Sequence, residues 1–586
     1  MFNKVMVANR GEIAIRVFRT LREMGIPSVG IYSETDRDAL FVRHADEAYL
    51  LGPGLAAETY LNVPRILEIC ADAGVDAVHP GYGFLAENAG FARALAEAGV
   101  VWIGPPPDAI DAMGSKVQAR ALMDAAGVPI VPGVTEPVAD IDAARPIADE
   151  IGYPVAVKAS AGGGGKGFRV ALTPEGLPDA FEGAIREGER FFADGAVYLE
   201  RYLPHPRHVE IQILADTHGA CIYLGERDCS VQRRHQKLVE ETPSPVVSDD
   251  LRRRMGEASV RAAQAVGYTS AGTLEYLVAG DEFFFLEMNT RIQVEHTVTE
   301  AVTGMDLIRE QVRVAAGEHL SVTQAEVAPR GHAFECRINA EDASQRFLPT
   351  PGLITAYREP SGPGVRVDSG VRAGSVIPEI YDPRVAKLIT WDVDRDSARR
   401  RMLRALDEYV VEGPTTLIPF HRWLLTEQEF IDGGACHDLM AQLAETPTPI
   451  PSADAPPREI PGDEAGEAEP LATRRFTAEV GGRRFDVALH FPASEAGGGG
   501  GPAPAARPKK KRERPGGDAA GGGAPNEVVT PMQGTVLRVL VEAGQQVAAG
   551  DVVAIVEAMK MENEVPAHRH GTVGEVRVGD GQAVQA

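Results

Sequence analysis

The sequence contains 586 residues, too many for a single hydrophobic core, and this length predicts about three to five domains. Hydrophobic residues make up 44% of the chain and charged residues 24%, a balance typical of globular proteins. The formal net charge of −25 argues against nucleic acid or an anionic membrane as the main partner, so anionic substrates would have to meet local basic clusters.

Cysteine usage and the amino terminus indicate the compartment. The five cysteines are scattered without a CxxC pair, which fits a reducing compartment without structural zinc. The opening segment MFNKVMVANRGEIAIRV lacks the apolar core of a signal peptide, and no apolar run is long enough to span a bilayer. We therefore expect a cytoplasmic protein.

The amino-terminal region predicts a βαβ unit. Residues 4–9 alternate as a short strand, and apolar residues then recur at helical spacing between residues 13 and 24. Gly25 and Pro27 end that helix, and residues 29–32 form the next predicted strand. No GxGxxG fingerprint follows the first strand. We expect a doubly wound, Rossmann-like parallel sheet in an α/β protein.

A glycine-rich run at residues 161–167 predicts a phosphate-binding segment. A predicted strand over 153–158 delivers Lys158 just before the run, and residues 168–170 resume an extended pattern, which is the layout of a hairpin flap. Successive glycines let backbone N–H groups approach a phosphate closely, and Lys158 and Lys116 can add positive charge. The run reads Gly-Lys-Gly, so it is not a Walker A loop. A flexible linker is the alternative interpretation.

A cationic segment at residues 225–237 stands out in this acidic chain. It reads GERDCSVQRRHQK and predicts a basic loop. The ordinary interpretation of such a charge run is a solvated face.

Two acidic strands predict a metal site. Residues 272–278 and 283–289 alternate as strands around a tight turn, so Glu275 and Glu287 should meet across a hairpin. Two neighbouring carboxylates repel each other unless a cation lies between them, and Mg²⁺ bridging nucleotide phosphates is the expected occupant.

A row of polar residues continues beyond this hairpin. If the chain stays extended, a period of two places Asn289, Arg291, Gln293 and Glu295 on one face and a largely apolar row on the other. A solvent-facing edge strand would explain the alternation. It would not explain why a metal pair is followed by one cation and one potential base.

The carboxyl-terminal region contains an internal repeat. GTVLRVLVEAGQQV at residues 534–547 recurs as GTVGEVRVGDGQAV at 571–584, with Lys560 between the copies. Two similar halves joined by a hairpin predict a small flattened β-barrel that presents Lys560 at its tip. An ordinary surface lysine is the alternative, which the repeat and the flanking methionines make less favourable.

Two linkers precede this barrel. Residues 446–469 are rich in proline, alanine and acidic residues, and residues 497–525 are rich in glycine, proline and alanine. Between them, residues 475–491 predict a hairpin about Gly481-Gly482, which is marginal alone and should dock elsewhere, most favourably on a partner subunit. The basic run at 509–512 resembles a nuclear signal, but a self-repelling tether is the favoured interpretation.

Several motifs identify a family. AMKM at 558–561 resembles the biotinyl domain of biotin-dependent carboxylases, whereas lipoyl domains usually carry aspartate before the lysine. ANRGEIA at 8–14, HPGYGFLAEN at 79–88 and GHAFECRIN at 331–339 resemble biotin carboxylase, and the glycine-rich flap resembles the ATP-grasp family. The chain departs from the usual family pattern at Pro383 and Arg384, where a small residue and a methionine are more common.

This resemblance implies a multidomain architecture. A Rossmann-like amino-terminal domain would span 1–113, an ATP-grasp α+β domain 114–330 with a lid at about 131–203, and a mixed carboxyl-terminal domain 331–445. The linker with its hairpin would span 446–525, and an all-β biotinyl domain 526–586.

The resemblance also implies roles for individual residues. ATP would be bound by Lys116, Lys158, Gly164, Gly165, Glu200, Arg201, Tyr202, Leu203, His208 and His235. Metal ligands would be Glu275, Glu287 and Asn289, and bicarbonate would be held by Lys237, Arg291, Gln293 and the Val294 backbone. Glu295 would be the general base that gives carboxyphosphate. Arg337 would face the ureido group of biotin, which is attached to Lys560. A structural pairing of Arg337 with Glu335 or Glu341 is the alternative.

The implied protein is the α subunit of an acyl-CoA carboxylase, which uses biotin, ATP, Mg²⁺ or Mn²⁺ and bicarbonate. Its expected partners are a carboxyltransferase β subunit in a hetero-oligomer with several α and β subunits, and a biotin protein ligase. Neither nucleic acid nor a membrane is expected as a partner. Alternatives are a component of a pyruvate or other non-CoA carboxylase, an ATP-grasp ligase for another acid, and a non-enzymatic biotin-bearing scaffold.

Overall fold

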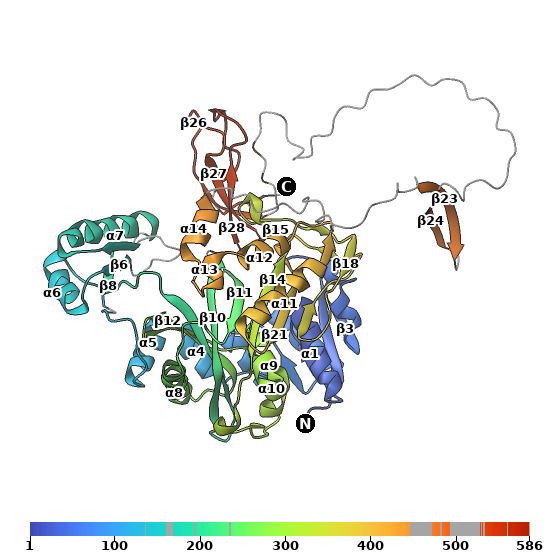
Figure 1. The fold of residues 1–586 in the computed structure, drawn as a ribbon, viewed down its shortest axis with the longest axis horizontal. Helices are drawn as coiled ribbons and strands as arrows, with labels where there is room; N and C mark the ends of the chain where they lie inside the picture. The colour runs from blue at the N-terminus through green and yellow to red at the C-terminus, as the bar shows by residue number, and fades with distance from the viewer. Residues whose placement is uncertain are drawn as a thin grey trace. The chain divides into compact units, whose positions relative to one another are not determined.

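A computed structural model divides the chain into two units (Figure 1), one comprising residues 1–453 with 530–586 and the other residues 454–529. It describes residues 1–134, 136–159, 168–192, 195–233, 236–445, 471–480, 483–492, 528, 530, 534–558, 561–579 and 581–584. No helix within these ranges has the length and apolar character needed to cross a membrane.

The amino-terminal region is built on a parallel sheet, as the sequence predicted. Its strands run in the order β3-β2-β1-β4-β5, and every neighbouring pair is parallel. The elements are β1 (Val5–Val7), α1 (Gly11–Glu23), β2 (Ser28–Ser33), η1 (Glu34–Asp36), η2 (Leu40–Arg43), β3 (Glu47–Gly52), α2 (Val63–Ala73), β4 (Ala77–His79), α3 (Ala89–Glu97) and β5 (Val101–Trp102). Helix α1 buries the apolar face that includes Ile13, Val17 and Leu21, and the positive φ of Gly25 ends it.

A small region with a sheet of its own follows helices α4 (Pro107–Gly114) and α5 (Lys116–Ala125). Its three-stranded antiparallel sheet has the order β7-β6-β8. Its elements are α6 (Ile141–Ile151), β6 (Val155–Ala159), β7 (Phe168–Ala171), η3 (Pro174–Gly176), α7 (Leu177–Phe192) and β8 (Val197–Arg201). A separate apolar cluster that includes Ala144, Val157 and Phe181 gives this region its own core.

An eight-stranded antiparallel sheet forms the centre of the larger unit. Its order is β13-β12-β9-β10-β11-β14-β21-β19. Its strands are β9 (Arg207–Ala215), β10 (Cys221–Arg233), β11 (Gln236–Thr242), β12 (Ser270–Ala279), β13 (Glu282–Asn289), β14 (His332–Asn339), β19 (Val365–Ser369) and β21 (Arg384–Asp392). Helices α8 (Asp249–Ala265), α9 (His296–Thr303) and α10 (Leu307–Ala315) and turn η4 (Gln324–Glu326) connect them.

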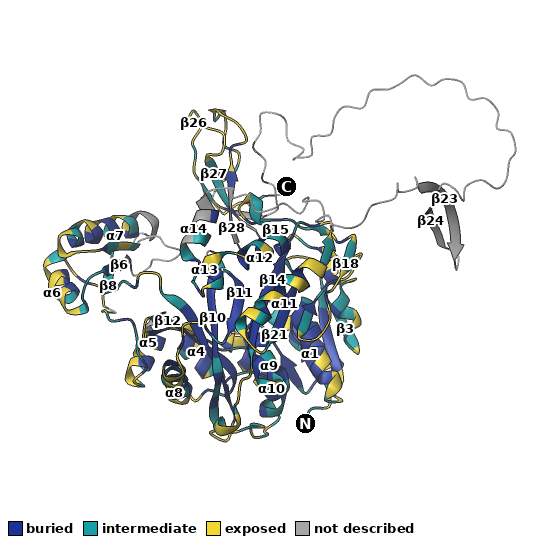
Figure 2. Cartoon of the chain, viewed as in Figure 1, coloured by how far each residue is buried: buried dark blue, intermediate teal, exposed yellow. Residues whose placement is uncertain are grey.

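The cationic segment at 225–237 is not the loop that the sequence predicted, but most of a β-hairpin. Strands β10 and β11 pair from Asp228↔Glu241 to Arg233↔Gln236. Most of its described charged residues are buried, namely Glu226, Arg227, Asp228 and Lys237, which excludes a simple solvated face. Figure 2 shows β10, β11, β14 and β21 as largely buried.

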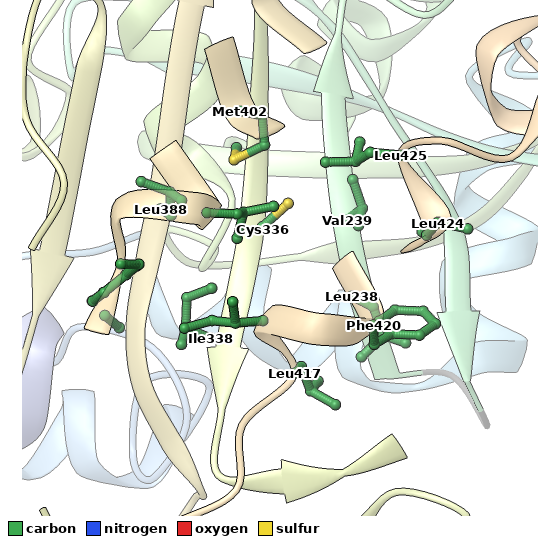
Figure 3. Packing of buried hydrophobic residues seen from close by; sticks show 14 of the residues in the cluster. Leu238, Val239, Cys336, Ile338, Leu388, Met402, Leu417, Phe420, Leu424 and Leu425 are labelled. Carbon is green, nitrogen blue, oxygen red and sulfur yellow. The ribbon is translucent and has the colours of Figure 1, made fainter. Parts of the chain in front are cut away.

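Residues 341–445 add a mixed α and β region. Short strands surround the sheet: β15 (Glu341–Asp342), β16 (Leu348–Pro349), β17 (Gly352–Leu353), β18 (Ala356–Arg358), β20 (Val376–Ile377) and β22 (Val410–Glu412), with turn η5 (Ala343–Gln345). Helices α11 (Arg395–Glu408), α12 (Ile418–Leu424), α13 (Gln428–Ile431) and α14 (His437–Glu445) complete it. Leu238, Ile338, Leu388, Met402 and Phe420 pack together in its core (Figure 3).

The smaller unit contains one described hairpin, β23 (Leu471–Val480) with β24 (Arg483–Pro492). It extends beyond the predicted 475–491, and the expected Gly481-Gly482 turn lies outside the described residues.

The carboxyl-terminal barrel follows the internal repeat. A four-stranded sheet has the order β28-β27-β25-β30, and a second sheet pairs β26 with β29. The strands are β25 (Gly534–Val539), β26 (Gln546–Val547), β27 (Val552–Ala558), β28 (Met561–Pro566), β29 (Gly571–Thr572) and β30 (Ala583–Val584). Val536, Val556 and Val565 form its core. The two repeat copies thus contribute β25 with β26 and β29 with β30, as expected for two similar halves.

Candidate functional site

The predicted acidic hairpin is present. Strands β12 and β13 pair antiparallel, and the register sets Glu275 opposite Glu287 and Thr273 opposite Asn289. Glu275 is buried, whereas Glu287 is exposed. This hairpin therefore brings the three predicted metal ligands to one end of the sheet.

The carboxylate of Glu275 is surrounded by donors. Its Oε1 accepts hydrogen bonds from Lys237 Nζ at 2.9 Å, Asn289 Nδ2 at 2.9 Å and Gln293 Nε2 at 2.8 Å. Its Oε2 lies 2.8 Å from His208 Nε2. Burial acts to raise the pKa of Glu275, but Lys237 and His208 outweigh burial and hold that pKa well below its ordinary value. Glu275 is therefore ionised at neutral pH.

Lys237 joins three carboxylates in the centre of the site. Its Nζ donates to Glu210 at 2.6 Å and to Glu295 at 2.6 Å, in addition to Glu275. Burial acts to lower the pKa of Lys237, but these carboxylates hold it well above its ordinary value. The ammonium is therefore charged, and one cation draws together side chains from β9, β12 and the start of α9.

The prediction of a polar row required the segment after β13 to stay extended. It does not. Strand β13 ends at Asn289, and Glu295 adopts φ −82° and ψ 9° before helix α9 begins at His296. The polar row itself is buried, with Asn289 at 7%, Gln293 at 2% and Glu295 at 2% exposure, which excludes a solvent-facing edge strand. The polar residues still converge, but a turn rather than an alternating strand brings them together.

Arg291 and Val294 lie in this turn. Arg291 donates to the Oδ1 of Asn289 at 2.8 Å and pairs with Glu87 at 3.0 Å. The carbonyl of Val294 accepts a hydrogen bond from Lys387 at 2.8 Å. The turn is thus fixed from both the amino-terminal and the carboxyl-terminal regions.

Arg337 lies between two carboxylates, and neither is Glu335 or Glu341, the structural partners considered from the sequence. Its Nη2 donates to Glu295 Oε2 at 2.9 Å, and its Nε donates to Glu240 Oε1 at 2.6 Å. Burial acts to raise the pKa of Glu295, but Lys237, Arg337 and Arg227 hold it well below its ordinary value. Glu295 is therefore ionised, which is the state that a proton acceptor requires.

The predicted nucleotide residues are only partly described. Lys158 on β6 forms an ion pair with Glu200 on β8, Arg201 pairs with Glu282 at 3.2 Å, and Tyr202 packs against Phe168. Leu203 lies in a small buried cluster with Val131 and Phe284. Helix α5 begins at Lys116, but the side chain of Lys116 lies outside the described residues, as do Gly164, Gly165 and His235.

Lys560 falls between the two strands of a hairpin, as predicted. Strands β27 and β28 pair as far as Ala558↔Met561. Met559 and Lys560 come between these partners in sequence and lie outside the described residues.

The sequence does not predict four residues that contact the site: Glu87, Glu210, Arg227 and Glu240. Arg227 donates from Nε to Glu210 at 2.5 Å and from Nη2 to Gln293 at 2.6 Å. A signal for Glu210 was available, because polar residues alternate at 208, 210 and 212 along β9, and the register sets Glu210 opposite Glu275. The other three contacts join segments too distant in sequence for a periodic pattern to connect.

Comparisons with known proteins decide the family. Four family models match: "Biotin carboxylase, N-terminal domain" at 1–110, "Carbamoyl-phosphate synthase L chain, ATP binding domain" at 115–323, "Biotin carboxylase C-terminal domain" at 335–442 and "Biotin-requiring enzyme" at 526–586. The chain is 45% identical over 586 residues to the alpha3 subunit of a biotin-dependent acyl-coenzyme A carboxylase from Mycobacterium leprae, covering 99% of this chain and 97% of that protein. The chain is a biotin carboxylase joined to a biotin carrier domain.

Other relatives are similar over about three quarters of the chain. A pyruvate carboxylase subunit of Methanothermobacter thermautotrophicus is 53% identical over 433 residues, covering 74% of this chain and 88% of that protein. The biotin carboxylase domain of Hydrogenobacter thermophilus 2-oxoglutarate carboxylase, solved with MgADP, ADP and bicarbonate, matches with a TM-score of 0.68 and 45% identity over 76% of this chain and 99% of that chain. This biotin carboxylase is therefore an ATP-dependent ligase that uses bicarbonate, a divalent metal ion and biotin.

The described residues fit a hard divalent cation. Two carboxylates and one amide side chain, from Glu275, Glu287 and Asn289, supply the oxygen donors that Mg²⁺ and Mn²⁺ prefer. The register pairs Glu275 with Glu287, and the ammonium of Lys237 lies 2.9 Å from Glu275 Oε1. The cation, when bound, would neutralise phosphate charge.

Proposed function

We propose that this biotin carboxylase is the α subunit of an acyl-CoA carboxylase that acts on acetyl-CoA, propionyl-CoA or a similar thioester. The observation that carries the proposal is the full-length similarity to an acyl-CoA carboxylase alpha3 subunit, which includes both linkers and the carrier domain. The similarity to the pyruvate carboxylase subunit covers only 74% of the chain.

Bicarbonate would be held beside Glu295. The planar guanidinium of Arg291 matches an oxyanion, and Lys237, Gln293 and the Val294 backbone complete the binding surface. Glu295 would accept the proton of bicarbonate, so that a bicarbonate oxygen attacks the γ-phosphorus of ATP and forms carboxyphosphate with release of ADP. The ionised state of Glu295 and its 2.6 Å contact with Lys237 support this role.

ATP would lie between the lid and the acidic hairpin. The nucleotide would be bound by described residues Lys158, Glu200, Arg201, Tyr202, Leu203 and His208, by Lys116, whose side chain is not described, and by Gly164, Gly165 and His235, which lie outside the described ranges. Glu275, Glu287 and Asn289 would hold the cation. Fixing both substrates in one place converts their encounter into a reaction within a single complex.

Biotin would be attached to Lys560, and Arg337 would contact its ureido group. Strands β27 and β28 pair as far as Ala558 and Met561, so Lys560 falls in the sequence between the two strands of a hairpin, which supports this role. The proposed carboxylase consists of three domains, at residues 1–113, 114–330 and 331–445. A linker at 446–525 joins it to the carrier domain at 526–586. The linker would let the carrier visit a second active site.

That second site would belong to a carboxyltransferase β subunit. The β23–β24 hairpin would dock on it, because an isolated two-stranded ribbon is marginally stable in water. A biotin protein ligase would modify Lys560, and several α and β subunits would form the hetero-oligomer. Cytoplasm is the expected compartment.

The experiment is to purify the tagged chain from its own cells, identify the subunit that co-purifies, and assay acetyl-CoA, propionyl-CoA, pyruvate and 2-oxoglutarate as acceptors. Carboxylation of an acyl-CoA supports the proposal. Carboxylation of pyruvate or 2-oxoglutarate alone would support the second candidate, a component of a non-CoA carboxylase, which the 53% identity to the pyruvate carboxylase subunit favours.

A further inference from the structure

Arg337 is held by Glu240, a residue to which the reaction proposed above gives no role. The Nε and Nη2 atoms of Arg337 both lie 2.6 Å from Glu240 Oε1, and Nη2 also donates to Glu295 at 2.9 Å. Glu240 is 0% exposed and Arg337 is 7% exposed. A charge-assisted contact of this length in a buried site is among the strongest of side-chain interactions.

The planarity of the guanidinium makes this contact directional. When Nε and Nη2 are both fixed, the plane of the group is fixed, and with it the direction in which Nη1 points. The backbone of Arg337 is held as well, because its carbonyl oxygen lies 2.8 Å from Nε2 of His421. The guanidinium therefore presents one defined edge to a ligand.

A second buried carboxyl group lies next to Glu240. The register of β11 and β14 sets Glu240 directly opposite Glu335, which is also 0% exposed. Burial, together with the negative charge of Glu240, raises the pKa of Glu335 to about 8, although Lys387 and Arg337 oppose the shift. Burial raises the pKa of Glu240 as well, but the 2.6 Å contact with Arg337 opposes that shift. Glu335 is therefore the member of the facing pair that holds a proton more readily.

We propose that Glu240 is the positioning residue for Arg337 in the step that involves biotin, and that Glu240 has little part in the activation of bicarbonate. This inference rests on the proposed contact between Arg337 and biotin. Glu295 contacts Lys237 and Arg337 independently, so bicarbonate activation keeps its base when Glu240 is changed. The two half-reactions should thus respond differently to a change at Glu240.

The experiment uses the full chain with Lys560→Arg, so that carboxylation depends on added free biotin. Two rates are measured: bicarbonate-dependent ADP release without biotin, and carboxylation of free biotin. Glu240→Gln should lower kcat/KM for biotin by about 10- to 100-fold, the loss expected for a hydrogen bond to a charged group, and leave biotin-free ADP release within about threefold. Glu335→Gln, a matched change in the facing carboxyl group that is mostly protonated at neutral pH, should alter neither rate by more than about threefold.

A double-mutant cycle tests whether Glu240 acts through Arg337. In an Arg337→Met background, Glu240→Gln should cause no further loss of biotin carboxylation. A parallel fall of both rates in Glu240→Gln, or no fall in either, overturns the positioning role. If Arg337→Met itself retains normal biotin carboxylation, the proposed biotin contact is wrong, which is a separate result. Should Glu240→Gln fail to fold, Glu240→Asp keeps the charge but withdraws it by one methylene, and the same two rates decide.

Discussion

The carboxylate of Glu295 lies 2.6 Å from the ammonium of Lys237, and the same ammonium lies 2.6 Å from Glu210 and 2.9 Å from Glu275. One cation thus compensates a proposed base, a proposed metal ligand and a carboxylate shared with Arg227. Replacing Lys237 should therefore change both the pKa of Glu295 and the stability of the site.

Lys237→Met should therefore shift the pH dependence of bicarbonate-dependent ADP release. The pKa of Glu295 is held below its ordinary value chiefly by Lys237 against burial, so losing the ammonium raises that pKa. The low-pH limb of the residual activity should move to higher pH. The free energy of unfolding should fall by about 3–5 kcal/mol, because buried carboxylates lose their partner. If the low-pH limb of the pH–rate profile does not move, Lys237 does not set the pKa of the base.

Glu295→Gln should lower the rate of bicarbonate-dependent ADP release by about 100-fold or more, because an amide cannot accept the proton of bicarbonate. Binding of ATP, measured by calorimetry, should change little. Glu97→Gln, an exposed carboxylate on α3, is the control and should keep full activity. Normal turnover in Glu295→Gln would exclude this residue as the base.

Glu287→Gln should raise the Mg²⁺ concentration needed for half-maximal ADP release by about 10-fold, because removing one charged oxygen donor weakens a site for a hard cation. Glu282→Gln at the start of the same strand is a matched control, since this exposed residue pairs with Arg201 rather than facing Glu275. Equal Mg²⁺ requirements in the two variants would exclude Glu287 as a ligand.

Lys560→Arg should eliminate biotin from the chain, as measured by streptavidin blotting and intact mass. It should leave carboxylation of free biotin by the carboxylase core intact, because the described core residues lie in other regions of the chain. Lys511→Arg in the basic run is the control and should remain biotinylated. A biotinylated Lys560→Arg chain would place the attachment elsewhere.

Glu335→Gln should make stability less dependent on pH. The folded-state pKa of about 8 lies above the ordinary value of 4.5, so the folded chain holds this proton more tightly than the unfolded chain does. The stabilisation is complete below about pH 4.5 and is lost as pH rises towards 8. Between pH 6 and 8.5, the thermal midpoint of the wild type should therefore fall more steeply than that of Glu335→Gln. Parallel slopes would show that Glu335 is ionised when folded.

Local patterns predicted much of the fold and part of the site. The βαβ opening, the acidic hairpin and the repeated barrel each follow from periodicity and turn residues within a short segment. Glu275 and Glu287 were placed opposite each other because a tight turn fixes register. The internal repeat predicted Lys560 at a hairpin tip, whereas only the resemblance indicated its attachment to biotin and the role of Arg337.

The sequence did not predict contacts that depend on sheet order. Glu240 meets Arg337 because β11 and β14 are neighbours, although the two residues are 97 positions apart. The prediction of an extended polar row was wrong for a different reason. A period of two holds only while the strand continues, and the chain turns at Glu295 into α9. Gln293 and Glu295 nevertheless reach Glu275 and Lys237 through that turn.

The eight-stranded sheet runs without a break from β13 to β19, so it joins strands on both sides of residue 330. A fragment ending there would leave β11 with one long, unpaired edge where β14 belongs. Such an edge offers a row of free backbone donors and acceptors to any other chain, which is a route to aggregation. Attempts to express the nucleotide-binding half by itself should therefore yield insoluble protein, and a cut near residue 446, beyond the last helix of the core, should not.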